Sequence, residues 1–108
     1  MTITITEQRG DPGRLLVSGG LTIYDAAAAK SALLEALART RELEIDLSGV
    51  NEVDTAGVQL LILLKREAVR AGKSMRLLQH SAASLEVLDR YNLASYFGDP
   101  LVLSPGAV

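Results

Sequence analysis

The first residues of the chain alternate between polar and apolar side chains and predict an antiparallel pair of strands. Residues 2–6 read T-I-T-I-T, and this period of two places one face of a strand on a core and the other in water. Residues 10–13 read G-D-P-G, which favours a turn, and residues 14–18 are predicted to form the second strand, ending at Gly19 and Gly20. We therefore expect a hairpin at the start of the sheet.

Helical periodicity appears three times after this hairpin. The first helix is predicted from its N-cap Asp25, whose side chain is expected to accept a hydrogen bond from the first turn, to Arg39. The second helix is predicted to begin within residues 54–57 and to end before Gly72, a residue suited to a left-handed C-cap, and the third follows the predicted cap Ser81. The apolar positions recur at spacings of three and four: Ala29, Leu33, Leu34 and Leu37; Leu60, Leu61, Leu64, Ala68 and Ala71; Leu85, Leu88 and Tyr91.

Short apolar segments between and after the helices predict the remaining strands. These segments are residues 43–47, residues 75–78 and, near the end of the chain, residues 101–103. Strands that alternate with helices favour an α/β fold, here a mixed, mostly parallel sheet of four to five strands with an N-terminal hairpin and three or more helices. We expect one domain over residues 1–103 and a flexible tail over residues 104–108.

Composition excludes several classes of function. The 108 residues hold no Cys and one His, so a disulfide framework, a thiolate metal site or a His-rich zinc site is excluded, and we expect no cofactor or metal. A net charge of −2 and the absence of Trp argue against a nucleic-acid partner. The longest apolar run, residues 60–64, is too short to span a bilayer, and residues 1–6 do not resemble a signal peptide. We expect a cytoplasmic protein without direct membrane insertion.

The strand-to-helix junction at residues 53–61 is the main candidate for chemistry. Backbone N–H groups are unpaired at a helix start, and Asp54 or Thr55 is predicted to cap them, with Gly57 allowing close helix packing. A second interpretation is that Thr55 is an exposed hydroxyl open to a kinase, at a helix end that tolerates a phosphate. The residues alone leave both interpretations open.

The junction resembles a known family. Residues 46–50 read D-L-S-G-V and residues 54–58 read D-T-A-G-V. Together they resemble the signature of the STAS domain, D-L-S-x-V followed by D-[ST]-[SATG]-G-[LV], which anti-sigma factor antagonists and sulfate transporters share. Residues 19–21 are similar to the G-E-L-D turn of the family, although residues 20–22 lack both of its acids. The later elements lie at the usual distances, so the resemblance covers essentially the whole domain.

This resemblance implies a non-enzymatic interaction switch. In STAS proteins the Ser or Thr directly after the Asp is phosphorylated by a partner kinase, and that position maps to Thr55. The unmodified form is expected to bind an anti-sigma factor or serine/threonine kinase, and the phosphorylated form to be released. The expected partner surface comprises Asp54, Thr55, Val58, Gln59 and Ile62.

Two other partners fit the same resemblance. Thr in place of Ser at the phosphosite is similar to STAS members of stressosome-type scaffolds, of lipid-trafficking ABC transporters and of chemotaxis clusters. The alternatives are therefore a constitutive subunit docked on an ABC ATPase, with Thr55 as a contact, or a chemotaxis adaptor. In each case we expect a monomer or weak dimer.

Rival interpretations of the acidic residues lack the necessary partners. A response-regulator receiver with Asp46 as acceptor would need an acidic pair after its first strand and a Lys after a late strand, and no Lys follows Lys73. An enzyme would pair Asp46 with Asp54, or His80 with Ser81, but no hydrolase elbow or phosphate-binding loop is present. We interpret Asp46 as a loop-capping carboxylate and His80 as a solvent-facing residue.

A basic cluster lies on the latter half of the second predicted helix and continues beyond its end. It is either a solvated face that complements the helix dipole or an electrostatic rim for an acidic partner. Near Thr55, Ile62 or Leu63 would add an apolar spot if exposed. The cluster comprises Lys65, Arg66, Arg70, Lys73 and Arg76.

Overall fold

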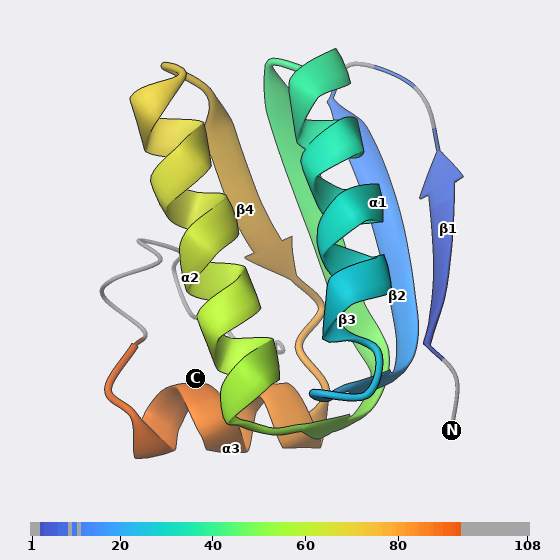
Figure 1. Ribbon diagram of the computed structural model, residues 1–108, viewed down its shortest axis with the longest axis vertical. Helices are drawn as coiled ribbons and strands as arrows, with labels where there is room; N and C mark the ends of the chain where they lie inside the picture. The colour runs from blue at the N-terminus through green and yellow to red at the C-terminus, as the bar shows by residue number, and fades with distance from the viewer. Residues whose placement is uncertain (1–2, 9, 11, 94–108) are drawn as a thin grey trace.

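A four-stranded mixed sheet with three helices makes up the part of the chain that the computed structural model describes, residues 3–8, 10 and 12–93 (Figure 1). The strands are ordered β1-β2-β3-β4; β1 pairs with β2 antiparallel, and the other two pairings are parallel. This confirms the predicted α/β class and the N-terminal hairpin. The elements are β1 (Thr4–Gln8), β2 (Gly13–Leu21), α1 (Ala26–Arg39), β3 (Glu42–Val53), α2 (Thr55–Arg70), β4 (Ser74–Leu78) and α3 (Ala82–Arg90).

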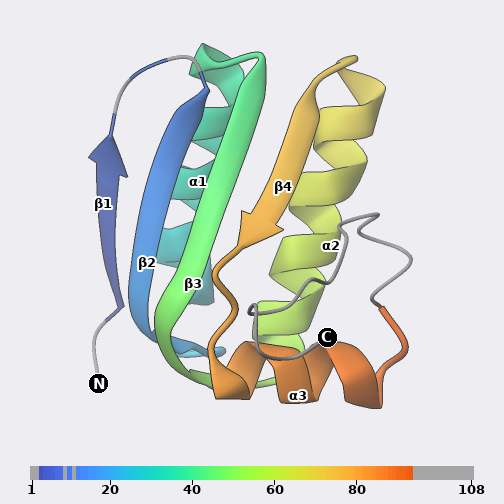
Figure 2. The same ribbon diagram turned by 180° about the vertical axis from the view of Figure 1, so that it is seen from behind.

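The helices lie on the sheet in two places. α1 and α2 run side by side over one face (Figure 1), and α3 crosses the end of the molecule where α2 begins and packs against β3 (Figure 2). The core is formed between these layers because the helices turn their apolar faces toward the strands. Its most deeply buried large side chains include Leu15, Leu21, Leu33, Leu43, Ile45, Leu47, Val50 and Leu64.

Three strands continue beyond their predicted ends, and the first of them, β1, runs to Gln8 although the prediction ended at residue 6. β2 does not stop at Gly19 but reaches Leu21, and β3 extends to Val53. The two pair in parallel along this added length, with register irregularities near Ser18 and Gly19. Gly49 allows the close approach, since a Cβ there would lie 2.6 Å from the Cβ of Ser18. Long-range pairing therefore sets these strand ends, and local sequence does not reveal it.

The helix ends follow their predicted caps with one exception. Ser81 forms a reciprocal capping box with Ser84, and Gly72 has φ +69°, as expected for a left-handed C-cap. The prediction that the side chain of Asp25 caps α1 is wrong. Its ψ of 1° is not the extended N-cap geometry that aims the carboxylate at the first turn, and its own N–H donates to the carbonyl of Thr22.

Two apolar positions of the predicted helices lie at the surface. Ala71 is exposed as the C-cap of α2, and Tyr91, which follows the last residue of α3, is 48% exposed. The predicted strand at residues 101–103 and the tail at residues 104–108 lie outside the described residues. Within the described part of the chain, no helix combines the length and the apolar character that crossing a bilayer requires.

Candidate functional site

The site predicted at the start of α2 lies where β2 and β3 end. Because these strands are parallel, the segment after β2 (residues 22–25) and Asp54, which follows β3, meet at the same edge of the sheet. The backbone joins them, since the N–H of Asp54 donates to the carbonyl of Leu21 at 3.2 Å. In open α/β sheets, binding sites form in this position, outside the carboxyl ends of the strands.

Asp54 binds both segments through one carboxylate. Its Oδ1 accepts a hydrogen bond from the N–H of Gly57 at 3.1 Å, which makes it the N-cap of α2 and confirms the capping prediction. Its Oδ2 accepts from the N–H of Ile23 at 2.9 Å, which fixes the segment after β2 to the start of α2. The carboxylate thus orders two parts of the site at once.

The pKa of the Asp54 carboxyl reflects these bonds. Burial by itself raises the pKa, because it removes the charged form from water, but hydrogen bonds from backbone N–H groups, among them those of Ile23 and Gly57, outweigh burial. The net pKa is lower than the ordinary value for Asp. A carboxylate held ionised as a hydrogen-bond acceptor is a poor general acid, so Asp54 is a structural anchor of the site.

Gly57 lets α2 approach β2 closely. A Cβ at this position would lie 2.2 Å from the carbonyl oxygen of Leu21, closer than a Cβ can come to backbone. The same carbonyl accepts the N–H of Asp54. Glycine is therefore needed here because no Cβ fits between α2 and β2, and not because the backbone has a special angle. This agrees with the close helix packing that the sequence analysis predicted.

Thr55 is the first residue of α2 and is exposed. Its hydroxyl makes no hydrogen bond to residues 3–8, 10 or 12–93. Gln59 lies one turn further along the same helix and is also exposed. These two side chains are accessible to a macromolecular partner.

Two members of the predicted partner surface are less accessible. Val58 is 5% exposed and Ile62 is half-buried against the core, so the prediction of a contact through the Val58 side chain does not fit this position. The sequence did contain a signal that Val58 is buried. Val58 lies three residues before the core position Leu61, so the two side chains lie on the same face of the helix.

Two exposed apolar residues were missed by the sequence analysis. Ile23 is 68% exposed and Tyr24 is 92% exposed, directly beside Asp54. Two consecutive bulky apolar residues between a strand and a helix satisfy neither a period of two nor one of 3.6, and this mismatch is the available sequence signal. They give the site an apolar rim.

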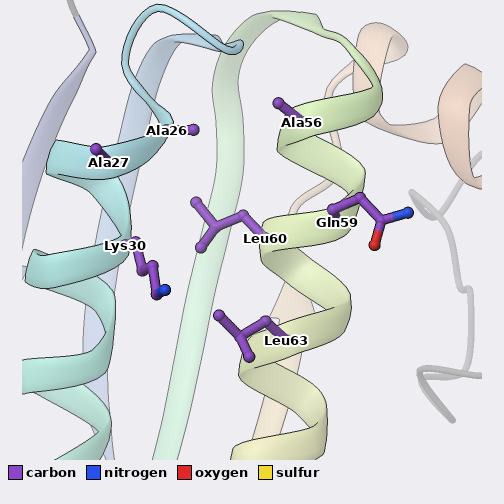
Figure 3. Close-up of a pocket in the computed structure, with 7 residues that line it drawn as sticks. All are labelled: Ala26, Ala27, Lys30, Ala56, Gln59, Leu60 and Leu63. Carbon is purple, nitrogen blue, oxygen red and sulfur yellow. The ribbon is translucent and has the colours of Figure 1, made fainter.

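A groove between α1 and α2 adjoins the site (Figure 3). Its volume is about 290 Å³, and Leu60 and Leu63 point from α2 toward α1 while Gln59 points away. Among the described residues that line it, Lys30 alone carries a charged side chain. Neither Ile62 nor Leu63 is exposed, and both pack partly buried against the core, so the exposed apolar spot expected near Thr55 is not formed by them; Leu63 instead lines the groove. The lining residues are Ala26, Ala27, Lys30, Ala56, Gln59, Leu60 and Leu63.

The other candidate residues have structural contacts. The buried Asp46 accepts hydrogen bonds from the backbone N–H and the hydroxyl of Ser48 at 2.9 and 2.6 Å, as expected of a loop-capping carboxylate. His80 is half-buried and not solvent-facing as predicted; its Nδ1 lies 3.3 Å from the hydroxyl oxygen of Ser84. Among the described residues, no group of three or more His, Asp or Glu side chains could hold a metal ion.

Most of the basic cluster is engaged within the protein. The ammonium of Lys73 donates to the carbonyls of Leu37 and Ala38 at 2.7 and 3.1 Å and so closes the end of α1. Arg70 pairs with Glu67 at 3.4 Å, Arg76 with Glu44 at 3.8 Å, and the ammonium of Lys65 lies 3.5 Å from the carbonyl of Met75. Arg66 is exposed. These contacts favour the interpretation as a solvated, dipole-complementing face.

The fold and the site define a small α/β domain with an exposed hydroxyl at a carboxylate-capped helix start. Residues 5–103 match the protein family described as "Mlab, STAS domain", and the chain belongs to this family. No curated protein matches the chain.

Solved structures of the same fold agree with this assignment. An anti-sigma factor antagonist from Mycobacterium paratuberculosis superposes with a TM-score of 0.80 at 22% identity, covering 94% of this chain and 87% of that one. The Bacillus cell fate determinant SpoIIAA in its phosphorylated form gives 0.66 at 15% identity, covering 96% of both chains. A STAS-domain anti-sigma factor antagonist from Rhodobacter sphaeroides gives 0.59 at 21% identity, covering 71% of this chain and 86% of that one.

Proposed function

We propose that this STAS domain is a non-enzymatic protein-interaction switch. Its unmodified form binds a partner protein over the start of α2, and phosphorylation of Thr55 releases the partner. The observation that carries the proposal is the exposed Thr55 hydroxyl, without a hydrogen bond to the described residues, at the first position of α2. The surface comprises Asp54, Thr55 and Gln59, with Ile62 at its edge.

Phosphorylation would change the charge of this surface at one point. The γ-phosphoryl group of ATP would pass to the hydroxyl oxygen of Thr55, whose proton is lost, and ADP would leave. The product carries about −1.5 to −2 charges beside the Asp54 carboxylate. A helix N-terminus tolerates such a group in water, but a closely packed interface does not solvate it. Modification would therefore break the complex without unfolding the domain.

The partner we favour is an anti-sigma factor or serine/threonine kinase. In support, several of the similar solved structures are named as anti-sigma factor antagonists, and SpoIIAA has been solved in both phosphorylated and unphosphorylated forms. Such a partner implies a cytoplasmic protein, monomeric or weakly dimeric, whose domain we place at residues 1–103.

A second candidate function is supported by the groove between α1 and α2. An apolar groove that begins at Ala56, directly after Thr55, also suits a constitutive contact with an ABC-transporter ATPase in which the hydroxyl is never modified, or a role as a chemotaxis-cluster adaptor. The two candidates differ in one observable, the phosphorylation state of Thr55 in the cell.

The test uses a partner identified by pull-down and then purified. Thr55→Glu is expected to weaken binding strongly, whereas the control Thr6→Glu adds the same charge at an exposed position of β1 and should leave binding unchanged. Intact-mass analysis of the protein from cells then reports modification. Equal binding by the wild type and Thr55→Glu would overturn the switch, and an unmodified Thr55 with a stable ATPase complex would favour the constitutive subunit.

A further inference from the structure

Ile23 and Tyr24 project from the segment that connects β2 to α1. Ile23 is 68% exposed and Tyr24 is 92% exposed, the two highest values among the large hydrophobic residues that the structure describes as exposed. Large aromatic and aliphatic side chains at this exposure are typical of protein-contact sites, where they fill recesses on a partner. Thr22, directly before the pair, is buried at the end of β2, and Ala26, two residues after Tyr24, lines the groove.

One hydrogen bond connects this pair to the start of α2. The N–H of Ile23 donates to Oδ2 of Asp54 at 2.9 Å, while the other oxygen of the same carboxylate accepts from Gly57. Within the segment itself, the N–H of Asp25 donates to the carbonyl of Thr22 at 3.0 Å, which shapes the turn but does not tie it to α2. The Asp54 carboxylate is therefore the side-chain link between Thr55 and the exposed pair.

We propose that Ile23 and Tyr24 form a second contact on the partner surface, that Asp54 positions them, and that negative charge on Thr55 loosens this hold. The proposal rests on the proposed function and adds how the switch acts. The occupant is the same protein that covers Thr55, and it presents an apolar recess for the Ile–Tyr pair. Continuity supports this choice, since the N–H of Ile23 bonds to the carboxylate of Asp54, the residue directly before Thr55.

The coupling follows from electrostatics and from competition for donors. A phosphate on Thr55 adds about −1.5 to −2 charges on the residue next to the ionised Asp54, and like charges repel. The phosphate oxygens also need N–H donors, and the donors at the start of α2 include the N–H of Gly57 that Asp54 now uses. If the carboxylate turns away, the N–H of Ile23 loses its acceptor and the exposed pair loses its fixed position.

This coupling makes a prediction that needs no partner. Amide hydrogen exchange of the full chain, followed residue by residue by NMR, reports the Ile23 N–H directly. We expect the Ile23 amide to exchange about tenfold faster in Thr55→Glu than in the wild type, while the Asp25 amide and the core amides keep their rates. Two controls should keep the wild-type exchange rate of the Ile23 amide. Thr55→Gln introduces a side chain of the size of Glu without its charge, and Thr6→Glu introduces the charge at another exposed position.

The outcomes separate this inference from the proposed function. Unchanged Ile23 exchange in Thr55→Glu, or equal acceleration of all amides, would overturn the coupling. If that variant loses partner binding while Ile23 exchange stays unchanged, the coupling is wrong and the switch itself stands. If Ile23 exchange accelerates but the wild type and Thr55→Glu bind the partner equally, the proposed function is wrong.

A second variant tests the contact. Tyr24→Ala removes a side chain that is 92% exposed, so folding should be unaffected, and we expect partner affinity to fall at least about tenfold. Tyr91→Ala is the matched control, because Tyr91 is also exposed, at 48%, and follows α3. Equal affinities for the wild type and Tyr24→Ala would remove the exposed pair from the partner surface.

Discussion

Replacing Gly57 by Ala tests whether close packing of α2 on β2 builds the site. The added Cβ would lie 2.2 Å from the carbonyl oxygen of Leu21 and 3.0 Å from its carbonyl carbon and its Cβ. An ordinary contact needs about 3.2 Å, so the helix start and the strand must separate by about 1 Å. Both contacting groups are backbone or held by backbone, so no side chain can turn aside.

The magnitude follows from what this separation breaks. The hydrogen bond from Asp54 N–H to the Leu21 carbonyl, at 3.2 Å, and that from Ile23 N–H to Asp54, at 2.9 Å, cross the same gap. Losing two such bonds costs about 2–4 kcal/mol, and the better helix propensity of Ala offsets about 1 kcal/mol. We therefore expect Gly57→Ala to lower the free energy of unfolding by about 2 kcal/mol, which corresponds to about 8–12 °C in Tm.

The assay is urea unfolding followed by circular dichroism, with Gly20→Ala as the control. Gly20 lies beside Leu21 on the same strand, but a Cβ there would meet only the methyl of Thr22, at 3.3 Å, and side-chain atoms of Glu52. Its cost should stay within about 1 kcal/mol. A stability for Gly57→Ala within about 0.5 kcal/mol of the wild type would refute the close-packing argument.

Three further substitutions test other contacts by the same unfolding assay. Asp54→Asn should cost about 1 kcal/mol at pH 7, because an amide offers one acceptor oxygen where the carboxylate uses two. The lowered pKa of Asp54 stabilises the fold above the pKa of the unfolded chain, so this difference should shrink as the pH falls below about 4 and vanish once the pH is below the lowered pKa of the folded protein; a constant difference would contradict it. Lys73→Met should cost about 1 kcal/mol by freeing the two carbonyls that end α1, whereas Arg66→Met at an exposed position should cost nothing measurable. Glu44→Gln should cost about 1 kcal/mol, because Glu44 is 16% exposed and bridges two arginines across the sheet, while Glu86→Gln in an exposed pair should not; equal effects would contradict the argument from burial.

Local sequence predicts the helices and most of their caps because those features depend on neighbours within four residues. Ser81 and Gly72 behave as their residue types suggest. Asp25 and Asp54 both precede helices, yet only Asp54 caps one with its side chain, since backbone geometry and not residue type decides where a carboxylate points.

The remaining features depend on contacts between distant segments. The ends of β2 and β3 are set by their mutual pairing, which neither sequence segment contains alone. The location of the candidate site was predictable from the pattern around Thr55, but its extent was not. Ile23 lies 31 residues from Asp54 in sequence, and the hydrogen bond between them fixes it to the site.

The central claim is that the phosphorylation state of Thr55 controls binding. The most direct measurement is the affinity of the purified partner for the unmodified protein and for the same protein phosphorylated at Thr55, with both forms verified by intact mass. The account predicts that phosphorylation weakens binding by about 100-fold or more, because an uncompensated charge in an interface costs several kcal/mol. Equal affinities for the two forms would contradict it.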